Sequence, residues 1–295
     1  MEVINLSKKK FRNLRPLKLP KSVLNTETKI YKFERGKKQY ILKQIYDDKG
    51  PLLAYKLYTL EMLSTYKDFI PDNFILPTNL VSVNQKVVGF TTPFISGINL
   101  QEILNSPSID RKEKIYYLKR IGEILENIKN IRHYTPLTDF YINDLHESNF
   151  LVNNQKKQLY VVDTDSFKIA NNSVFCSRYL SPSPLFRHAN TKKYPRIHTF
   201  NIGGYVMPNE NSDLYCYSII VLNFLYGANV NNMNLSEYYT YLTYLSEIGI
   251  DKELIDIFAN LLTAKQNQNP YHLLDTLSYE QIGKASRNVF SLKMN

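Results

Sequence analysis

Cysteine is scarce in this chain, and its scarcity excludes several classes of site. The 295 residues include two cysteines, Cys176 and Cys216, and no CxxC pair. Such a sequence does not support a disulfide framework or a cysteine-based zinc site. We therefore expect a reducing compartment and a cytoplasmic protein.

Long apolar runs are also missing. No run of about eighteen apolar residues occurs, and residues 1–21 are basic and lack the apolar core of a signal peptide. The sequence therefore predicts neither a membrane span nor secretion. The formal net charge of +10 favours acidic partners in a general way, but no zinc-finger or RNA-binding pattern indicates nucleic acid.

The most informative stretch is residues 142–167, where three oxygen-bearing side chains are spaced in a telling way. Asp144 precedes Asn149 by five residues, and Asp163 follows Asn149 by fourteen. Two short apolar runs around a polar turn separate Asn149 from Asp163, which is typical of a β-hairpin. Such a hairpin would bring Asp163 back beside Asn149. A carboxylate and an amide oxygen together suit Mg²⁺, and Asp144 would remain close by as a second carboxylate.

This arrangement resembles the catalytic core of the protein-kinase superfamily, where a loop ending D-x-x-x-x-N precedes a hairpin and a metal-binding Asp. The resemblance covers about residues 22–265 and implies an α+β, bilobal protein kinase-like fold with nucleotide held between the lobes. It also implies ATP and Mg²⁺ as cofactors, Asn149 and Asp163 as metal ligands, and Asp144 as the base that orients the acceptor hydroxyl. A polar turn beside an ordinary hairpin is the alternative.

Residues 29–33 and 39–43 alternate on either side of a turn that contains Gly36, which predicts two strands joined by that turn. Lys43 ends the second strand pattern, like the strand lysine that binds phosphate in this family. An exposed strand lysine is the alternative. Glu61 lies in a predicted helix over residues 51–66, and in the resemblance it would pair with Lys43. A surface charge is the alternative for Glu61.

The stretch FTTPFISG, residues 90–97, resembles a kinase hinge. In the resemblance, the backbone of Phe94, Ile95 and Ser96 would meet the adenine edge, whereas a plain interdomain linker would have the same pattern. The expected organisation is a basic N-terminal arm or edge segment at residues 1–21, a small β-rich N-lobe at 22–95 and a larger helical C-lobe at 96–295.

Several positions depart from the family pattern. Residues 25–28 stand where the phosphate-covering loop has glycines, and they contain none. The residues before Asp144 lack the Arg that would grip a phosphorylated loop, which implies activity without that switch. His146 gives the loop the form D-L-H-x-x-N, which resembles aminoglycoside and choline phosphotransferases. It is interpreted as a catalytic contact to the transferred phosphate, with a structural imidazole as the alternative.

Asp165 belongs to D-T-D-S-F, which stands in place of D-F-G and resembles an atypical bacterial subset of kinase-like sequences. We interpret Asp165 as a turn residue, with a second metal contact as the alternative.

The apolar stretch from Ser212 to Gly227 resembles the central helix of the kinase C-lobe. Ser212 is the predicted N-cap and Gly227 the predicted stop. Asp213 would accept hydrogen bonds from the backbone of the catalytic loop, unless it is an exposed first-turn Asp. Further helices are predicted over residues 110–133, 236–248, 251–264 and 271–285.

These patterns favour an ATP-dependent phosphotransferase, a protein serine/threonine kinase that transfers the γ-phosphate to a protein hydroxyl with Mg²⁺. The central helix favours this branch. A small-molecule kinase of the aminoglycoside or choline type is one alternative, and a nucleotide-binding pseudokinase is another.

Overall fold

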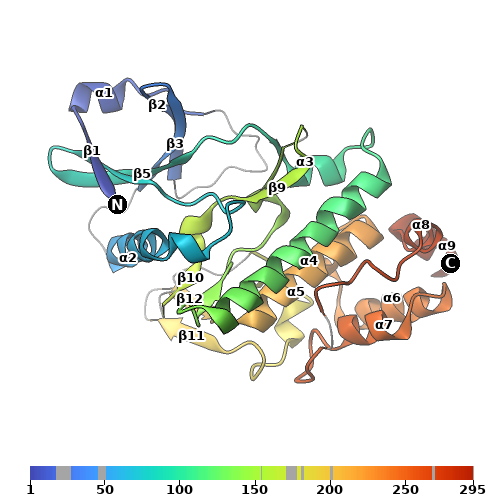
Figure 1. The fold of residues 1–295 in the computed structure, drawn as a ribbon. Helices are drawn as coiled ribbons and strands as arrows, with labels where there is room; N and C mark the ends of the chain where they lie inside the picture. The colour runs from blue at the N-terminus through green and yellow to red at the C-terminus, as the bar shows by residue number, and fades with distance from the viewer. Residues whose placement is uncertain are drawn as a thin grey trace. The chain divides into compact units, whose positions relative to one another are not determined.

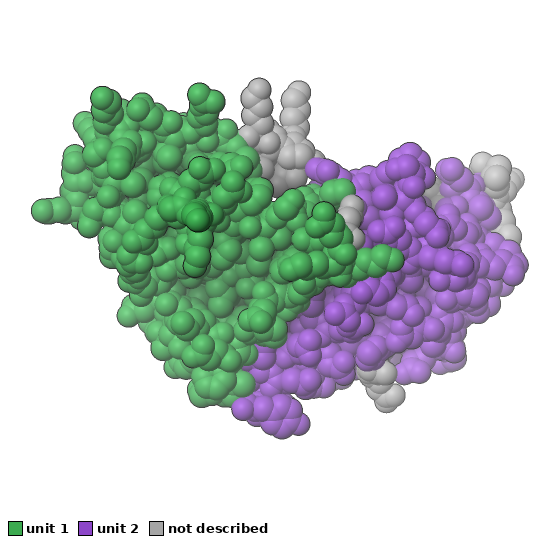
Figure 2. Space-filling view, turned by 45° about the horizontal axis from the view of Figure 1, so that its top comes forward, with its two compact units in different colours: residues 1–99, 135–140, 148–174 green, residues 100–134, 141–147, 175–295 purple. Residues whose placement is uncertain are grey.

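The computed structural model describes residues 1–17, 28–45, 51–153, 155–170, 178–180, 183–199, 202–267 and 270–294. The chain is mixed α+β and divides into two compact units, which Figure 2 distinguishes by colour. Unit 1 comprises residues 1–99, 135–140 and 148–174, and unit 2 comprises residues 100–134, 141–147 and 175–295. The segment that carries Asn149 and Asp163 therefore belongs with the N-terminal sheet.

Unit 1 is built on a five-stranded sheet with the order β1-β4-β5-β3-β2 (Figure 1). Its strands are β1 (Glu2–Leu6), β2 (Thr28–Arg35), β3 (Lys38–Ile45), β4 (Asn79–Val83) and β5 (Lys86–Pro93). The predicted hairpin of β2 and β3 is confirmed, and Gly36 in its turn has a φ of +61°, which glycine adopts without steric cost. β1 pairs in parallel with β4 as an edge strand, so residues 2–6 are an edge segment. The rest of the predicted arm includes the short helix α1 (Lys8–Arg12). Residues 18–21 of the arm lie outside the described residues.

The core of this sheet forms because apolar side chains alternate along its strands. Tyr31 and Phe33 of β2, Leu42 of β3, Val81 of β4 and Ile4 of β1 are all buried in one cluster. Burial of such side chains supplies about 1.5–3 kcal/mol each, so this cluster fixes the register of β3 and hence of Lys43.

A second, three-stranded sheet in unit 1 has the order β6-β8-β9. It is formed by β6 (Ile98–Asn99), β8 (Phe150–Asn153) and β9 (Gln158–Val161). The hairpin predicted from residues 150–162 is thus confirmed, with Phe150 opposite Val161. Val161 also exchanges backbone hydrogen bonds with Asn73 and Ile75, which ties the hairpin to the N-terminal part of unit 1.

The main helix of unit 1 is α2 (Pro51–Thr65), close to the predicted residues 51–66. Leu60 and Leu63 on its inner face are fully buried. The helix packs against the 3₁₀ turn η4 (Thr164–Ser166) and the short strand β10 (Lys168–Ile169). This packing places the side chains of α2 next to the segment that follows β9.

Unit 2 is predominantly helical, with α4 packed on the buried α5. Its helices are α3 (Leu100–Asn105), α4 (Arg111–Tyr134), α5 (Glu210–Tyr226), α6 (Leu235–Glu247), α7 (Lys252–Ala259), α8 (Tyr279–Lys284) and α9 (Arg287–Met294). Unit 2 also contains an antiparallel hairpin of β11 (Arg196–Thr199) and β12 (Ile202–Val206). Within the described residues, no helix combines the length and apolarity that crossing a bilayer requires.

The ends of α5 refine one prediction and confirm another. The N-cap is Asn209, not Ser212, because Asn209 Oδ1 accepts from Ser212 N while Ser212 Oγ accepts from Asn209 N. This reciprocal pair is a capping box. Gly227 ends the helix with a φ of +81°, as predicted. The helix expected over residues 271–285 is limited to α8, since Ser278 caps a helix that begins at Tyr279.

Gly122 is required where α4 passes the backbone of Tyr271. A Cβ on Gly122 would overlap the Tyr271 carbonyl oxygen and lie 2.9 Å from the Tyr217 hydroxyl. Gly122→Ala should therefore lower the free energy of unfolding by about 1–3 kcal/mol, measured by urea denaturation. Gly283→Ala in α8 is the control, because its Cβ would meet only the flexible end of Arg111 at 3.1 Å. Equal stability of the two variants would contradict the proposed packing constraint.

Candidate active site

Lys43 is the centre of a buried ion-pair cluster in unit 1. It lies in β3 opposite Phe90 of β5, and only 9% of its side chain is exposed. Its Nζ contacts Asp163 Oδ1 and lies 2.7 Å from Asp165 Oδ1. Burial alone would lower the pKa of Lys43, but the carboxylates of Asp163 and Asp165 hold that pKa above its usual range. The lysine is therefore charged, and not the exposed strand lysine of the alternative interpretation.

Lys56 on α2 completes the cluster. Its Nζ lies 2.6 Å from Asp165 Oδ2 and 3.1 Å from the Asp165 carbonyl oxygen. Asp165 is thus held by two lysines, one on each carboxylate oxygen, with 5% of its side chain exposed. Burial would raise the pKa of Asp165, but the ammonium groups of Lys43 and Lys56 hold it well below its usual range.

The expected pairing of Lys43 with Glu61 is not what the structure contains. Glu61 is exposed on α2, and within the described residues its carboxylate makes no ion pair. Both ion-pair partners of Lys43 come from the segment after β9. The residue of α2 that joins the cluster is a cation, Lys56. Glu61 is a surface charge, which was the alternative interpretation.

Asn149 and Asp163 lie at the open end of the β8–β9 hairpin, the first before β8 and the second after β9. The Val162 amide donates to the Asn149 carbonyl at 2.9 Å, so the pairing of the two chain segments continues past the hairpin to the residue before Asp163. Asp163 has a φ of +63°, an uncommon backbone conformation for a non-glycine residue that is enriched at functional sites. Ser166 Oγ donates to the Asp163 carbonyl at 2.8 Å and stabilises this turn.

The donor chemistry at this hairpin fits Mg²⁺. Lys43 contacts one oxygen of Asp163, and a carboxylate has a second oxygen and several lone-pair sites. The Asp163 side chain is 24% exposed, in contrast to Asp165. Mg²⁺ is typically bound by one or two protein oxygens together with phosphates and waters. Asn149 and Asp163 are the residues that would hold it.

The predicted hinge residues follow β5 in unit 1. The Phe94 amide donates to the Gln39 carbonyl at 3.1 Å, which leaves Ile95 and Ser96 as the candidate donors to an adenine edge. Ser96 is exposed, and its carbonyl accepts from Asn153 Nδ2 at 3.3 Å. Residues 25–27 of the glycine-free loop lie outside the described residues.

Asp144 and His146 lie in unit 2, on the loop between α4 and the hairpin. His146 Nε2 is 3.4 Å from Asp144 Oδ2, and His146 Nδ1 is buried without a hydrogen-bond partner in the described part of the chain. The imidazole therefore contacts the carboxylate, and its role toward a phosphate stays a prediction. Because Asp144 and the metal-ligand candidates belong to different units, their convergence also stays a prediction.

Asp213 fixes the backbone immediately before Asp144, as predicted. Its two carboxylate oxygens accept from the amides of Ile142 at 2.9 Å and Asn143 at 3.1 Å. Asn143 has a φ of +65°, so the carboxylate stabilises a strained turn. Burial raises the pKa of Asp213 to about 6, although the two amides and the charge of Arg132 act in the opposite direction.

From the sequence, Lys56 was not identified as a site residue, and Asp165 was assigned only to a turn. Asp165 does lie in a turn, η4, but it is also the central acceptor of the cluster. The D-T-D spacing was the available signal, because a second carboxylate two residues after Asp163 needs a cation if it is buried. Lys56 had no comparable signal in the sequence.

Asp165→Asn tests the cluster. It should lower the free energy of unfolding by about 3–5 kcal/mol in denaturant titrations, because Lys43 and Lys56 remain buried with one carboxylate fewer. Asp256→Asn makes the same chemical change at an exposed pair with Lys252, 2.7 Å apart, and should cost less than about 1 kcal/mol. A loss at Asp165 no larger than that at Asp256 would contradict the burial of Lys43 and Lys56 around this carboxylate.

The raised pKa of Asp213 predicts a pH dependence of stability. Since the folded protein holds this proton more tightly than the unfolded chain does, the contribution of Asp213 falls as pH rises from about 4 to about 6. The charged and titratable groups around it are Arg132, Glu210 and Tyr271.

The measurement is the free energy of unfolding of the wild type minus that of Asp213→Asn, from pH 4 to pH 7. The shared groups titrate in both proteins, so their contributions largely cancel in this difference, which should fall by about 2 kcal/mol. A difference that is flat or rises with pH would contradict the assignment.

No protein-family model matches this chain, and a search of curated proteins finds no match, so the interpretation of the site depends on its own chemistry.

Proposed function

We propose that this chain is an ATP-dependent phosphotransferase with a bilobal, protein kinase-like fold. The observation that carries the proposal is the buried contact between Lys43 of β3 and Asp163 after the β8–β9 hairpin. A strand lysine and a carboxylate at a hairpin exit are far apart in sequence, and the fold of unit 1 brings them together. Buried ion pairs are weak contributors to stability, so such a cluster is better explained by function.

The residues of the candidate site have distinct roles in this proposal. Lys43 contacts the nucleotide phosphates as a permanent positive charge, and Asp165 positions Lys43 through a second ion pair. Asn149 and Asp163 hold Mg²⁺, which neutralises phosphate charge. Asp144 orients the acceptor hydroxyl and accepts its proton. Phosphoryl transfer needs little covalent chemistry from the protein, so positioning and charge provide most of the rate.

The preferred acceptor is a serine or threonine hydroxyl of a protein. The support for this choice is α5, a helix buried along most of its length, whose Asp213 holds the backbone before Asp144. That arrangement is expected of the protein-kinase branch. A small-molecule acceptor is the second candidate, and the contact of His146 with Asp144 in a D-L-H-x-x-N loop favours it.

The test is transfer of labelled phosphate from ATP with Mg²⁺, with and without added protein acceptors. Asp144→Ala should reduce the rate about 10²–10⁴-fold, because the acceptor loses its base. Asp163→Asn should weaken Mg²⁺-dependent nucleotide binding, measured separately by titration.

Glu61→Gln is the matched control. Glu61 is exposed and unpaired with Lys43 in the described residues, so this change should leave both nucleotide binding and transfer unchanged. Label on added protein supports the serine/threonine kinase, and label on a small molecule supports the second candidate. Nucleotide binding without any transfer would refute catalysis and leave a pseudokinase.

A further inference from the structure

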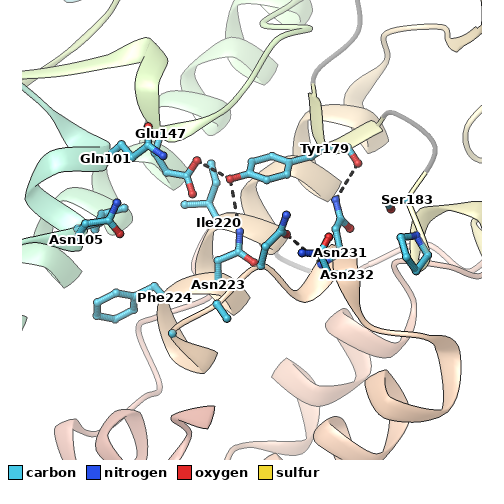
Figure 3. Close-up of a pocket in the computed structure, with 15 residues that line it drawn as sticks. Gln101, Asn105, Glu147, Tyr179, Ser183, Ile220, Asn223, Phe224, Asn231 and Asn232 are labelled. Carbon is cyan, nitrogen blue, oxygen red and sulfur yellow. Dashed lines mark hydrogen bonds between the residues drawn. The ribbon is translucent and has the colours of Figure 1, made fainter. Parts of the chain in front are cut away.

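A cavity of about 740 Å³ opens within unit 2, and all the residues that line it belong to that unit (Figure 3). Its walls come from α3, from the second half of α5 and from the turn that follows α5. This volume lies in the range of small-molecule sites, which is roughly 300–1,000 Å³. Most such sites are lined mainly by apolar groups, and this one differs.

Side-chain amides dominate the lining. Six of the fifteen residues that line the cavity carry an amide, namely Gln101, Asn105, Asn223, Asn229, Asn231 and Asn232. Glu147 is the one charged residue among the fifteen. An amide both donates and accepts hydrogen bonds, as a hydroxyl does, so this wall matches the hydrogen-bonding pattern of a hydroxylated ligand.

The inner wall is held rigidly by Tyr179. Its hydroxyl donates to Glu147 Oε2 at 2.5 Å, and Asn223 Nδ2 lies 3.5 Å from the same hydroxyl. The Asn231 amide donates to the Tyr179 carbonyl at 3.0 Å and accepts from Tyr215 at 2.7 Å. Figure 3 shows Glu147, Tyr179, Asn223 and Asn231 converging from different elements. The polar groups therefore need little reorganisation to bind a ligand.

The rim has adaptable groups. Asn105 and Asn232 are exposed, and in the described part of the chain no protein group bonds to either side-chain amide. They are available to a ligand at the mouth of the cavity. Phe224 is half-buried at the same wall and offers an apolar surface beside the amides.

We propose that this cavity binds an uncharged, polyhydroxylated small molecule of the saccharide class. Amides would exchange hydrogen bonds with its hydroxyls, and Glu147 would accept charge-assisted hydrogen bonds from neighbouring hydroxyls. Phosphorylated ligands are disfavoured, because the lining has one carboxylate and no cation. The proposal requires neither nucleotide nor Mg²⁺, so it does not depend on the proposed phosphotransfer.

The experiment titrates the full chain, without nucleotide, with maltose, trehalose and myo-inositol, and follows binding by calorimetry and by saturation-transfer NMR. At least one probe should bind saturably with one site per chain. Asn105→Ala and Asn232→Ala should each weaken that binding about five-fold, the equivalent of one hydrogen bond. Asn288→Ala removes an exposed amide from α9, outside the cavity, and should leave the affinity unchanged.

Two results would overturn the proposal. One is the absence of saturable binding for all three probes, and the other is equal affinity of the wild type and both rim variants. Glu147→Gln distinguishes an uncharged ligand from a cationic one, with glucose and glucosamine as probes. Similar affinities of the two sugars for the wild type support the uncharged class. A preference for glucosamine of about ten-fold or more that Glu147→Gln abolishes would assign a cationic ligand instead.

Discussion

A largely buried cluster of two lysines and two aspartates is the constraint on which the geometry of unit 1 depends. Lys43 comes from a sheet strand, Lys56 from a helix, and Asp163 and Asp165 from the exit of a hairpin more than a hundred residues further along. None of these charges could be buried alone, because an unpaired ion in the interior costs several kcal/mol. The strand, the helix and the hairpin exit can therefore be buried at this place only in each other's presence. Packing of apolar residues around them fixes the register of the strands, and the ion pairs fix which side chains meet.

Unit 2 also contains a buried carboxylate, but backbone amides stabilise it in place of lysines. Asp213, at the start of the buried α5, is satisfied by two backbone amides of the loop that carries Asp144. A carboxylate with a raised pKa is an unfavourable group to bury, and the positive φ of Asn143 is a second local cost. In each unit, one short polar segment thus lowers the conformational stability. Such local costs are typical of segments whose conformation matters for function.

The parts of the fold that the sequence predicted are those decided by local patterns. The β2–β3 hairpin with Gly36, the β8–β9 hairpin and the C-terminal end of α5 at Gly227 follow from alternation and glycine placement. The hydrogen bonds of Asp213 were expected from the family resemblance. The partner of Lys43 was not predicted correctly, because it depends on the rotation of α2. Lys56 and Glu61 are five residues apart, or about 140° around a helix, so only one of them can face the cluster. The sequence of α2 gives no strong signal of which face is inward, since its apolar residues are spread around the helix.

The charge balance of the cluster bears on why a metal would be needed. Two lysines and two aspartates sum to no net charge, so the cluster by itself provides little long-range attraction for a polyphosphate. Asp165 is buried and pairs with two lysines, whereas Asp163 has a more exposed side chain and, within the described residues, an ion pair with Lys43 alone. A divalent cation on Asp163 would convert a neutral site into a positive one and leave Lys43 anchored through Asp165. With a metal on Asp163, the ion pair between Lys43 and Asp165 would keep the lysine in place.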